Sequence, residues 1–331
     1  MGVDIGNGYI KIATEKGSIS IPSVLGRLEG DDELGIAAKH NIFKIESKTF
    51  KEIYSMGQDI LKICASSNLM TNTGEGRYTD RGFMIAIEGA IAYALSKHCS
   101  NENIFTIKVV TGVPSKEKNT ALEKELIKAI EGLHSVRIDN KEIVYEASVI
   151  KVHAQPLGTL FYKFINASNQ YPYDQKYIGI IDCGYGTIDI DGIKELRTVA
   201  SDRDTFNDVA AFTIYTKLAD YLNSVNPYAQ ANARSVELQF SNDIYKISDR
   251  ASVDIREAKE SILNEISKLL VNKLQSRWQN FTKFDNIILT GGSAYLFKRQ
   301  LSEKLGDIEI VDNPQMANTI GFYLFGKLYQ Q

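Results

Sequence analysis

The stretch IGIIDCGYGTIDI, residues 178–190, constrains the fold of this chain more than any other segment. An uncharged run ends in Asp182, and a second apolar run begins after a four-residue turn made of Gly184, Tyr185, Gly186 and Thr187. This pattern predicts a strand, a tight turn and a returning strand. The glycines allow bare N–H groups, with the Thr187 hydroxyl, to approach a phosphate closely. Because a carboxylate repels a phosphate, Asp182 indicates a hydrated Mg²⁺ between the two, since Mg²⁺ keeps several of its waters.

The N-terminal sequence MGVDIGNGYIKI repeats this pattern. Asp4 ends a short apolar run, and the turn that follows consists of Gly6, Asn7, Gly8 and Tyr9. Asn-Gly is a strong signal for a two-residue hairpin turn. Lys11 follows, where its ammonium can meet a β- or γ-phosphate as a point charge. Few residues precede Asp4, so we expect either a short first strand or a start that lies further upstream.

A third glycine turn occurs in NIILTGGSA, residues 286–294. An apolar strand is predicted to end in Thr290, followed by Gly291 and Gly292, and Ser293 is predicted to cap the next helix. Such a turn suits a phosphate or the ribose and base edge of a nucleotide. Taken alone, it favours an ordinary strand-to-helix connection.

Composition limits the classes of protein that need to be considered. With 331 residues, the chain is long enough for two domains at about 150 residues each. The 38 Lys and Arg against 41 Asp and Glu give a net charge of −3, so we expect no direct contact with nucleic acid. No apolar run approaches the roughly 18 residues of a membrane span, and the first hairpin leaves no room for a signal peptide. We therefore expect a cytoplasmic protein without a membrane contact.

The cysteines and histidines argue against a bound transition metal. Three widely spaced cysteines with no C-x-x-C pair indicate a reducing compartment and no structural zinc. Cys183, inside the key hairpin, is interpreted as a buried small hydrophobe rather than a nucleophile. The four histidines show no metal-ligand spacing.

The two halves of the chain share one order of predicted elements: strand, hairpin, strand, helix, strand, Thr-Gly. Helices are expected from Thr79 or Asp80 to about 97, from about 208 to 222, from 256 to 278 and from about 317 to 329. Residues 28–78 are expected to form an insertion with Phe43, Phe50 and Tyr54 as its own apolar anchors. Two similar α/β domains, each offering a glycine hairpin, would bind one nucleotide from both sides.

These motifs resemble those of a known superfamily. DIGNGYIK, IIDCGYGTIDI and ILTGGSA are similar to the first phosphate loop, second phosphate loop and adenosine motif of the actin, heat-shock chaperone and sugar-kinase ATPases, in the same order. Residues 152–160 and 317–326 resemble its two interdomain connectors. IPSVLGR, TNTG with the nearby Arg77 and Tyr78, VVTGVPS and AQPLGTL resemble segments of the ParM family of plasmid-segregating actin-like ATPases.

The resemblance implies an α/β, actin-like fold. Two RNase H-like domains would each hold a mixed five-stranded sheet flanked by helices, with a smaller subdomain on each. Domain I would comprise residues 1–153 and 316–331, with an insertion subdomain at about 28–78. Domain II would comprise residues 154–315, with an insertion subdomain at about 223–285.

The resemblance also assigns roles at a Mg²⁺–nucleotide site for ATP or GTP. Asp4 and Asp182 would hold the metal through water, and Gln155 would orient the attacking water, as glutamine does in some GTPases. The phosphates would bind from one side to Gly6, Asn7, Gly8, Tyr9 and Lys11, and from the other to Gly184, Tyr185, Gly186 and Thr187. The adenosine would be bordered by Gly291, Gly292 and Ser293.

The implied activity is nucleotide-driven polymerisation into filaments that move plasmid DNA through a DNA-binding adaptor of the ParR type. The partners would be further copies of the chain and this adaptor. The alternatives are a small-molecule kinase of the same superfamily, a chromosomally encoded cytoskeletal actin-like protein, including a membrane-linked one, and a non-hydrolysing scaffold. A kinase would need a further carboxylate base, and a membrane-linked protein an amphipathic end helix. The C-terminal segment is apolar nearly all round, which instead favours a buried helix.

Overall fold

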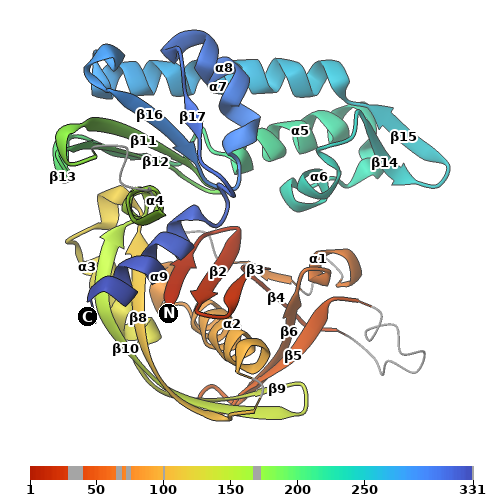
Figure 1. The fold of residues 1–331 in the computed structure, drawn as a ribbon. Helices are drawn as coiled ribbons and strands as arrows, with labels where there is room; N and C mark the ends of the chain where they lie inside the picture. The colour runs from red at the N-terminus through yellow and green to blue at the C-terminus, as the bar shows by residue number, and fades with distance from the viewer. Residues whose placement is uncertain (29–39, 65–68, 72–75, 100, 167–172, 330–331) are drawn as a thin grey trace. The chain divides into compact units, whose positions relative to one another are not determined.

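The computed structural model describes residues 1–28, 40–64, 69–71, 76–99, 101–166 and 173–329 (Figure 1). The chain forms two compact units: unit 1 comprises Met1–Ser168 and Met316–Gln331, and unit 2 comprises Asn169–Gln315. The predicted junction between residues 153 and 154 lies before helix α4, Pro156–Asn166, whereas unit 1 includes this helix. The reason is packing: α4 lies against α9, Ala317–Tyr329, so closely that a Cβ on Gly321 would be 1.8 Å from the Gly158 carbonyl oxygen.

Unit 1 is built on a mixed sheet whose strand order is β3-β2-β1-β8-β10-β9-β5-β6-β4-β7. Its strands are β1 Gly2–Ile5, β2 Tyr9–Thr14, β3 Gly17–Pro22, β4 Val24–Gly26, β5 Ile42–Ser47, β6 Glu52–Gly57, β7 Leu69–Thr71, β8 Ile104–Val113, β9 Gly132–Ile138 and β10 Lys141–Ala154. Its other helices are α1 Ile60–Ile63, α2 Arg81–His98 and α3 Ala121–Ile130. The first five strands in this order form the mixed five-stranded sheet that the family resemblance implied.

The long strand β10 explains why the sheet continues beyond five strands. Its first residues pair with β9 while most of its length pairs with β8, and β9 in turn pairs with β5. The described part of the insertion therefore joins the main sheet. Phe43 and Tyr54 are buried in the main core and Phe50 packs against it, so the prediction of a separately anchored insertion is wrong. Residues 29–39, 65–68 and 72–75, which include most of TNTG, lie outside the described residues.

Helices cover both faces of this sheet because its central strands bury side chains on both sides. On β8, Val109 belongs to the core that includes α2 and α3. The next residue, Val110, faces α9, where a Cβ on Gly326 would lie 3.0 Å from its Cγ2. The Asp80 carboxylate caps α2 by accepting a hydrogen bond of 2.9 Å from the Phe83 N–H, as predicted. The buried position of α9 is confirmed for its first turns, up to Gly326, whereas its last residues, Lys327, Leu328 and Tyr329, are exposed.

Unit 2 repeats the same five-stranded order, β13-β12-β11-β16-β17. Its strands are β11 Tyr177–Cys183, β12 Ile188–Lys194, β13 Arg197–Phe206, β16 Asn286–Thr290 and β17 Glu309–Ile310, with a separate hairpin of β14 Ile244–Ser248 and β15 Ala251–Asp254. Its helices are α5 Ala211–Val225, α6 Ala233–Gln239, α7 Arg256–Trp278 and α8 Ala294–Leu305. The internal repeat predicted from the sequence is thus a repeat of sheet topology.

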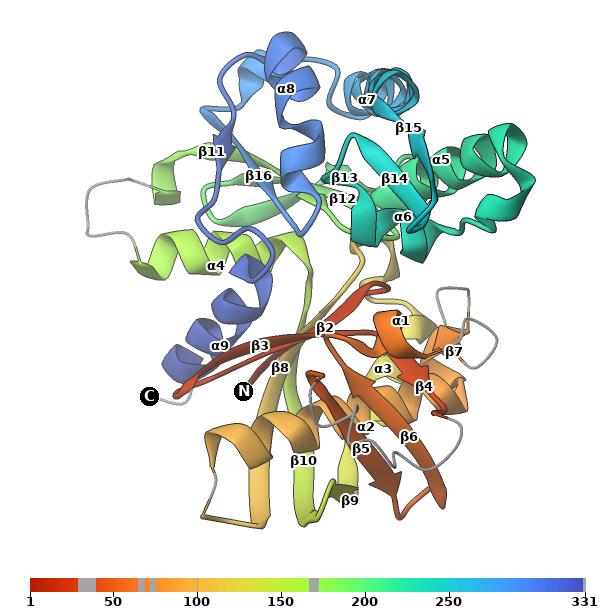
Figure 2. The same cartoon turned by 90° about the vertical axis from the view of Figure 1, so that its right-hand side faces the viewer.

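The core of unit 2 lies between one face of its sheet and helices α5, α7 and α8. The helix predicted over 256–278 is confirmed, whereas the one predicted from 208 begins at Ala211. Figure 2 shows α6 beside the β14–β15 hairpin, which it contacts. No helix among the described residues of either unit is long and apolar enough to cross a membrane.

Candidate functional site

The first glycine hairpin joins β1 to β2 in unit 1. Its turn closes through a hydrogen bond of 3.0 Å from the Gly6 N–H to the Tyr9 carbonyl. Ser23 fixes the turn from outside: its hydroxyl donates to the Gly6 carbonyl at 2.7 Å, and its N–H donates to the Gly8 carbonyl at 2.9 Å. The sequence analysis missed Ser23, and a serine between two strands gives no signal of such a contact.

Two of the predicted site residues, Lys11 and Gln155, contact the buried carboxylate of a third, Asp4. Lys11, its cross-strand neighbour, places Nζ 2.9 Å from Asp4 Oδ2. Gln155 Nε2 donates to Asp4 Oδ1 at 2.8 Å. Asp4 is 1% exposed and Gln155 7%. The carboxylate is therefore compensated by one ammonium and one amide, and the two partners lie far from each other in the sequence.

The second hairpin joins β11 to β12 in unit 2 and has the same backbone closure. The Gly184 N–H donates to the Thr187 carbonyl at 2.9 Å, as Gly6 does to Tyr9. Asp182 is 7% exposed and lies opposite Asp189 in the strand pair. The Thr187 hydroxyl donates to Asp189 Oδ2 at 2.9 Å. Asp189, 1% exposed, is thus a further carboxylate beside Asp182 that the sequence analysis did not select.

The third motif packs directly against the end of β11. Gly291 has φ +91°, and a Cβ there would lie 2.4 Å from Asp182 Oδ1, so only glycine fits. The Ser293 N–H donates to the Cys183 carbonyl at 2.9 Å. Ser293 occupies the N-cap position of α8, but its side chain makes no capping hydrogen bond, so the prediction of a serine cap is wrong. The turn is held instead by the strand that carries Asp182.

The side chains of Tyr185 and Cys183, at the second hairpin, pack in or against the core of unit 2. The Tyr185 ring contacts the rings of Phe212 and Tyr215, at centroid distances of 5.7 and 6.1 Å. Only the backbone of Tyr185 is therefore part of the turn. Burial, followed by the nearby Asp182 carboxylate, raises the pKa of the Cys183 thiol well above its ordinary value. This supports the interpretation of Cys183 as a buried hydrophobe.

The carboxylates suit a metal held through water better than one held directly. Within the described ranges of the chain, no group of three or more His, Cys, Asp or Glu side chains could hold a metal ion. The strand ends beside the glycine turns instead offer Asp4 in unit 1, and Asp182 with Asp189 opposite it in unit 2. Mg²⁺ tolerates this arrangement because it retains several waters, so the donor set fits a hydrated Mg²⁺.

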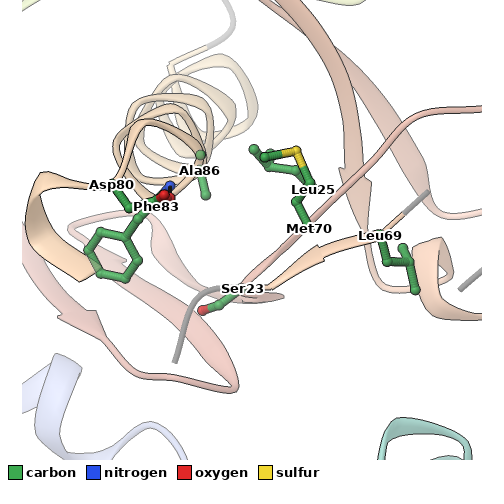
Figure 3. Close-up of a pocket in the computed structure, with 8 residues that line it drawn as sticks. Ser23, Leu25, Leu69, Met70, Asp80, Phe83 and Ala86 are labelled. Carbon is green, nitrogen blue, oxygen red and sulfur yellow. Dashed lines mark hydrogen bonds between the residues drawn. The ribbon is translucent and has the colours of Figure 1, made fainter. Parts of the chain in front are cut away.

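A pocket of about 270 Å³ lies in unit 1, next to the first hairpin (Figure 3). Its lining exposes polar and apolar atoms in similar amounts and consists of Ser23, Leu25, Leu69, Met70, Asp80, Gly82, Phe83 and Ala86. Ser23 belongs both to this wall and to the contacts that hold the hairpin turn. The lining residues include the carboxylate of Asp80 and no basic side chain, so the pocket is unsuited to phosphate.

Comparisons with known proteins agree with this architecture. Residues 2–158 match the family model of the actin-like proteins' N-terminal domain, and residues 180–303 match the C-terminal model of the archaeal actin homologue that resembles MreB. No curated protein matches the chain in sequence.

Among solved structures, the chain is similar to a non-polymerisable quadruple mutant of pCBH ParM, with TM-score 0.79, 20% identity and coverage of 98% of both chains. It is also similar to the archaeal actin homologue Ta0583 in complex with ADP, with TM-score 0.77, 16% identity and coverage of 99% of this chain and 98% of that one. A third similar structure is a 15-stranded ParM filament from Clostridium botulinum, with TM-score 0.77, 18% identity and the same coverage. These likenesses establish the fold, and the two family models together span both units: the chain belongs to the actin-like proteins.

Proposed function

We propose that this protein binds ATP or GTP with Mg²⁺, polymerises into filaments in the bound state and hydrolyses the nucleotide slowly. The observation that carries the proposal is the convergence of Lys11 and Gln155 on the buried Asp4, at the base of a glycine hairpin. Support comes from the ADP complex and the ParM filament among the similar structures. Asp4 and Asp182 would hold a hydrated Mg²⁺ through its waters, and the ion would neutralise charge on the phosphates.

The contacts at Asp4 suggest a division of work. The Lys11 ammonium is paired with the Asp4 carboxylate, and a phosphate can replace that carboxylate as its partner. Gln155 uses Nε2 to bind Asp4, which fixes the plane of its amide and leaves Oε1 to accept a hydrogen bond from water. An amide oxygen is a weak base, so Gln155 orients the attacking water rather than deprotonating it. We therefore expect slow hydrolysis that times filament disassembly.

The turns complete the site. Gly6, Asn7, Gly8 and Tyr9 in one hairpin, and Gly184, Tyr185, Gly186 and Thr187 in the other, offer backbone N–H groups to the phosphates. Gly291, Gly292 and Ser293 border the adenosine. As a cellular role, we propose plasmid segregation through a DNA-binding adaptor of the ParR type, because the net charge of −3 gives the chain itself no basic footprint for DNA. This role predicts that pure protein does not shift plasmid DNA on a gel.

Thermal melting with and without nucleotide tests the binding step. A ligand that binds only the native state, at a hundredfold excess over Kd, stabilises it by about 2.7 kcal/mol. Lys11→Ala should lose most of this gain, while Lys16→Ala, at the exposed turn between the next two strands, should keep it. Light scattering and negative-stain microscopy with ATP, GTP and ADP test assembly. A melting temperature that does not change at millimolar Mg–ATP and Mg–GTP would refute the proposal.

A further inference from the structure

We propose that Tyr185 and Arg234 couple the second glycine hairpin to helix α6, so that the state of the hairpin is passed to the small lobe formed by α6 and the β14–β15 hairpin. Arg234 is a positioning residue in this scheme, because it acts through Tyr185. The inference rests on the proposed function, since it assumes that the hairpin of residues 184–187 binds phosphate.

The first link is between the hairpin and α5. The Tyr185 carbonyl accepts a hydrogen bond of 2.8 Å from the Phe212 N–H. Helix α5 begins one residue earlier, at Ala211, and its N-cap residue Ala210 provides no side-chain cap. The first N–H groups of a helix need acceptors from outside the helix. The turn backbone therefore supplies one, and a shift of Tyr185 must shift the start of α5 or break this bond.

The second link is the Tyr185 ring, which lies between α5 and α6. Its α5 contacts are Phe212 and Tyr215, and on the α6 side the Arg234 guanidinium lies over the ring with Cζ 4.0 Å from the centroid. A guanidinium at this distance over an aromatic face makes a favourable cation–π contact. The side chain thus joins two helices to one residue of the turn.

Arg234 is itself held rigidly. Its Nη1 donates to Glu237 Oε2 at 2.8 Å, and the side chains are only 13% and 14% exposed. Asn232 and Ser235 cap α6 with a reciprocal pair of hydrogen bonds. The Tyr245 hydroxyl on β14 donates to the Ser235 hydroxyl at 2.9 Å, which ties the β14–β15 hairpin to the same turn. A displacement at Tyr185 therefore reaches a stiff lobe rather than a free side chain.

Hydrogen exchange followed by mass spectrometry tests this coupling, with Mg–ATP at saturation. In the wild type, nucleotide should slow exchange at the 184–187 hairpin and also in α6, by about tenfold, as expected for a contact of cation–π strength. Arg234→Gln should bind nucleotide within about twofold of the wild-type Kd but lose the slowing in α6. Arg250→Gln, a control at the exposed β14–β15 turn, should keep it.

A purely structural role gives a different result: Arg234→Gln would speed exchange in α6 equally with and without nucleotide, leaving their ratio unchanged, and this would overturn the inference. A second pair of variants covers the case in which Arg234→Gln does not fold. At saturating nucleotide, Tyr185→Phe should preserve the slowing in α6 because it keeps the ring, and Tyr185→Leu should abolish it. Equal slowing in both would overturn the inference.

The two proposals fail in distinguishable ways. If Mg–ATP slows exchange at the 184–187 hairpin of the wild type but not in α6, only the coupling is refuted. If it slows exchange nowhere, the proposed nucleotide binding is refuted, and the coupling with it.

Discussion

His153 should make the stability of unit 1 depend on pH, through the burial of a neutral imidazole. It lies at the end of β10 and is 8% exposed. Its ring contacts those of Phe161 on α4 and Phe325 on α9, at centroid distances of 4.8 and 4.5 Å. Among the residues that the structure describes, its Nε2 has no hydrogen-bond partner.

This environment lowers the pKa of His153 from 6.5 to about 4. Loss of hydration is the largest cause; the positive charges of Lys151 and Lys118 add to it, and Glu123 opposes it. At roughly 1.36 kcal/mol per pKa unit, this shift corresponds to about 3 kcal/mol.

The sign follows from which state binds the proton first. At pH values between the unfolded pKa of 6.5 and the folded pKa of about 4, His153 is protonated in the unfolded chain but not in the folded chain. The contribution of His153 is therefore complete above pH 6.5, falls by about 3 kcal/mol as the pH drops towards 4, and changes no further below that.

The test compares His153→Phe with the wild type in urea unfolding from pH 7.5 to 4.5, with α9 followed by hydrogen exchange. The variant should lose most of the pH dependence, because phenylalanine suits the aromatic surroundings and carries no proton. The control is His40→Gln, which changes a histidine outside this cluster and should leave the profile unaltered. Parallel profiles for His153→Phe and the wild type, or an imidazole that titrates near pH 6.5 by NMR, would refute the reasoning.

Three further outcomes are expected. Gln155→Ala should bind nucleotide with little change in Kd but release phosphate at least about tenfold more slowly, since each 1.36 kcal/mol of lost transition-state stabilisation slows the rate tenfold. Filaments should therefore persist in light scattering. Normal phosphate release with unchanged disassembly would make Gln155 a hinge residue only. Asp182→Ala should abolish hydrolysis and weaken assembly while its glycine turn survives, and wild-type phosphate release would contradict the metal assignment. Glu117→Gln should lower the unfolding free energy by about 3 kcal/mol, because it removes the negative charge that faces the largely buried Arg77, 2.8 Å away. A loss below about 0.5 kcal/mol in urea unfolding would show that the pair is screened like a surface one.

The backbone of the candidate site could be predicted because glycine turns have few geometries. Both hairpins close with the same hydrogen bond, from the first glycine to the residue three positions later. The repeated sheet order follows from the repeated order of strands and helices. The contact between Gln155 and Asp4 could not be derived from the residues, because it joins the ends of two strands that are separated by most of unit 1.

The direction of side chains was harder to predict, and β12 shows why. Its sequence, IDIDGIK, alternates apolar and acidic residues, which ordinarily indicates a strand with one solvent face. In the structure both faces are buried: Asp189 is 1% exposed and Asp191 is 0% exposed. Alternation of apolar and acidic residues shows only that the two faces of a strand differ. A buried face of paired carboxylates produces the same pattern as a face exposed to solvent. Asp191 is compensated by Arg203 at 2.7 Å, and Asp189 by threonine hydroxyls.

The buried carboxylates on β12 affect how the second hairpin works. Asp182 and Asp189 are opposite each other in the strand pair, so two carboxylates share one end of the sheet, close to the turn. Asp189 is already engaged by the hydroxyl of Thr187, which belongs to that turn. A phosphate that recruits the Thr187 hydroxyl must take it from Asp189, and a buried carboxylate that loses a donor is destabilised. Under the proposed function, the turn would therefore have two hydrogen-bonded arrangements, one with phosphate and one without. Two such arrangements are what a hairpin needs if it is to report its occupancy to the helices packed against Tyr185.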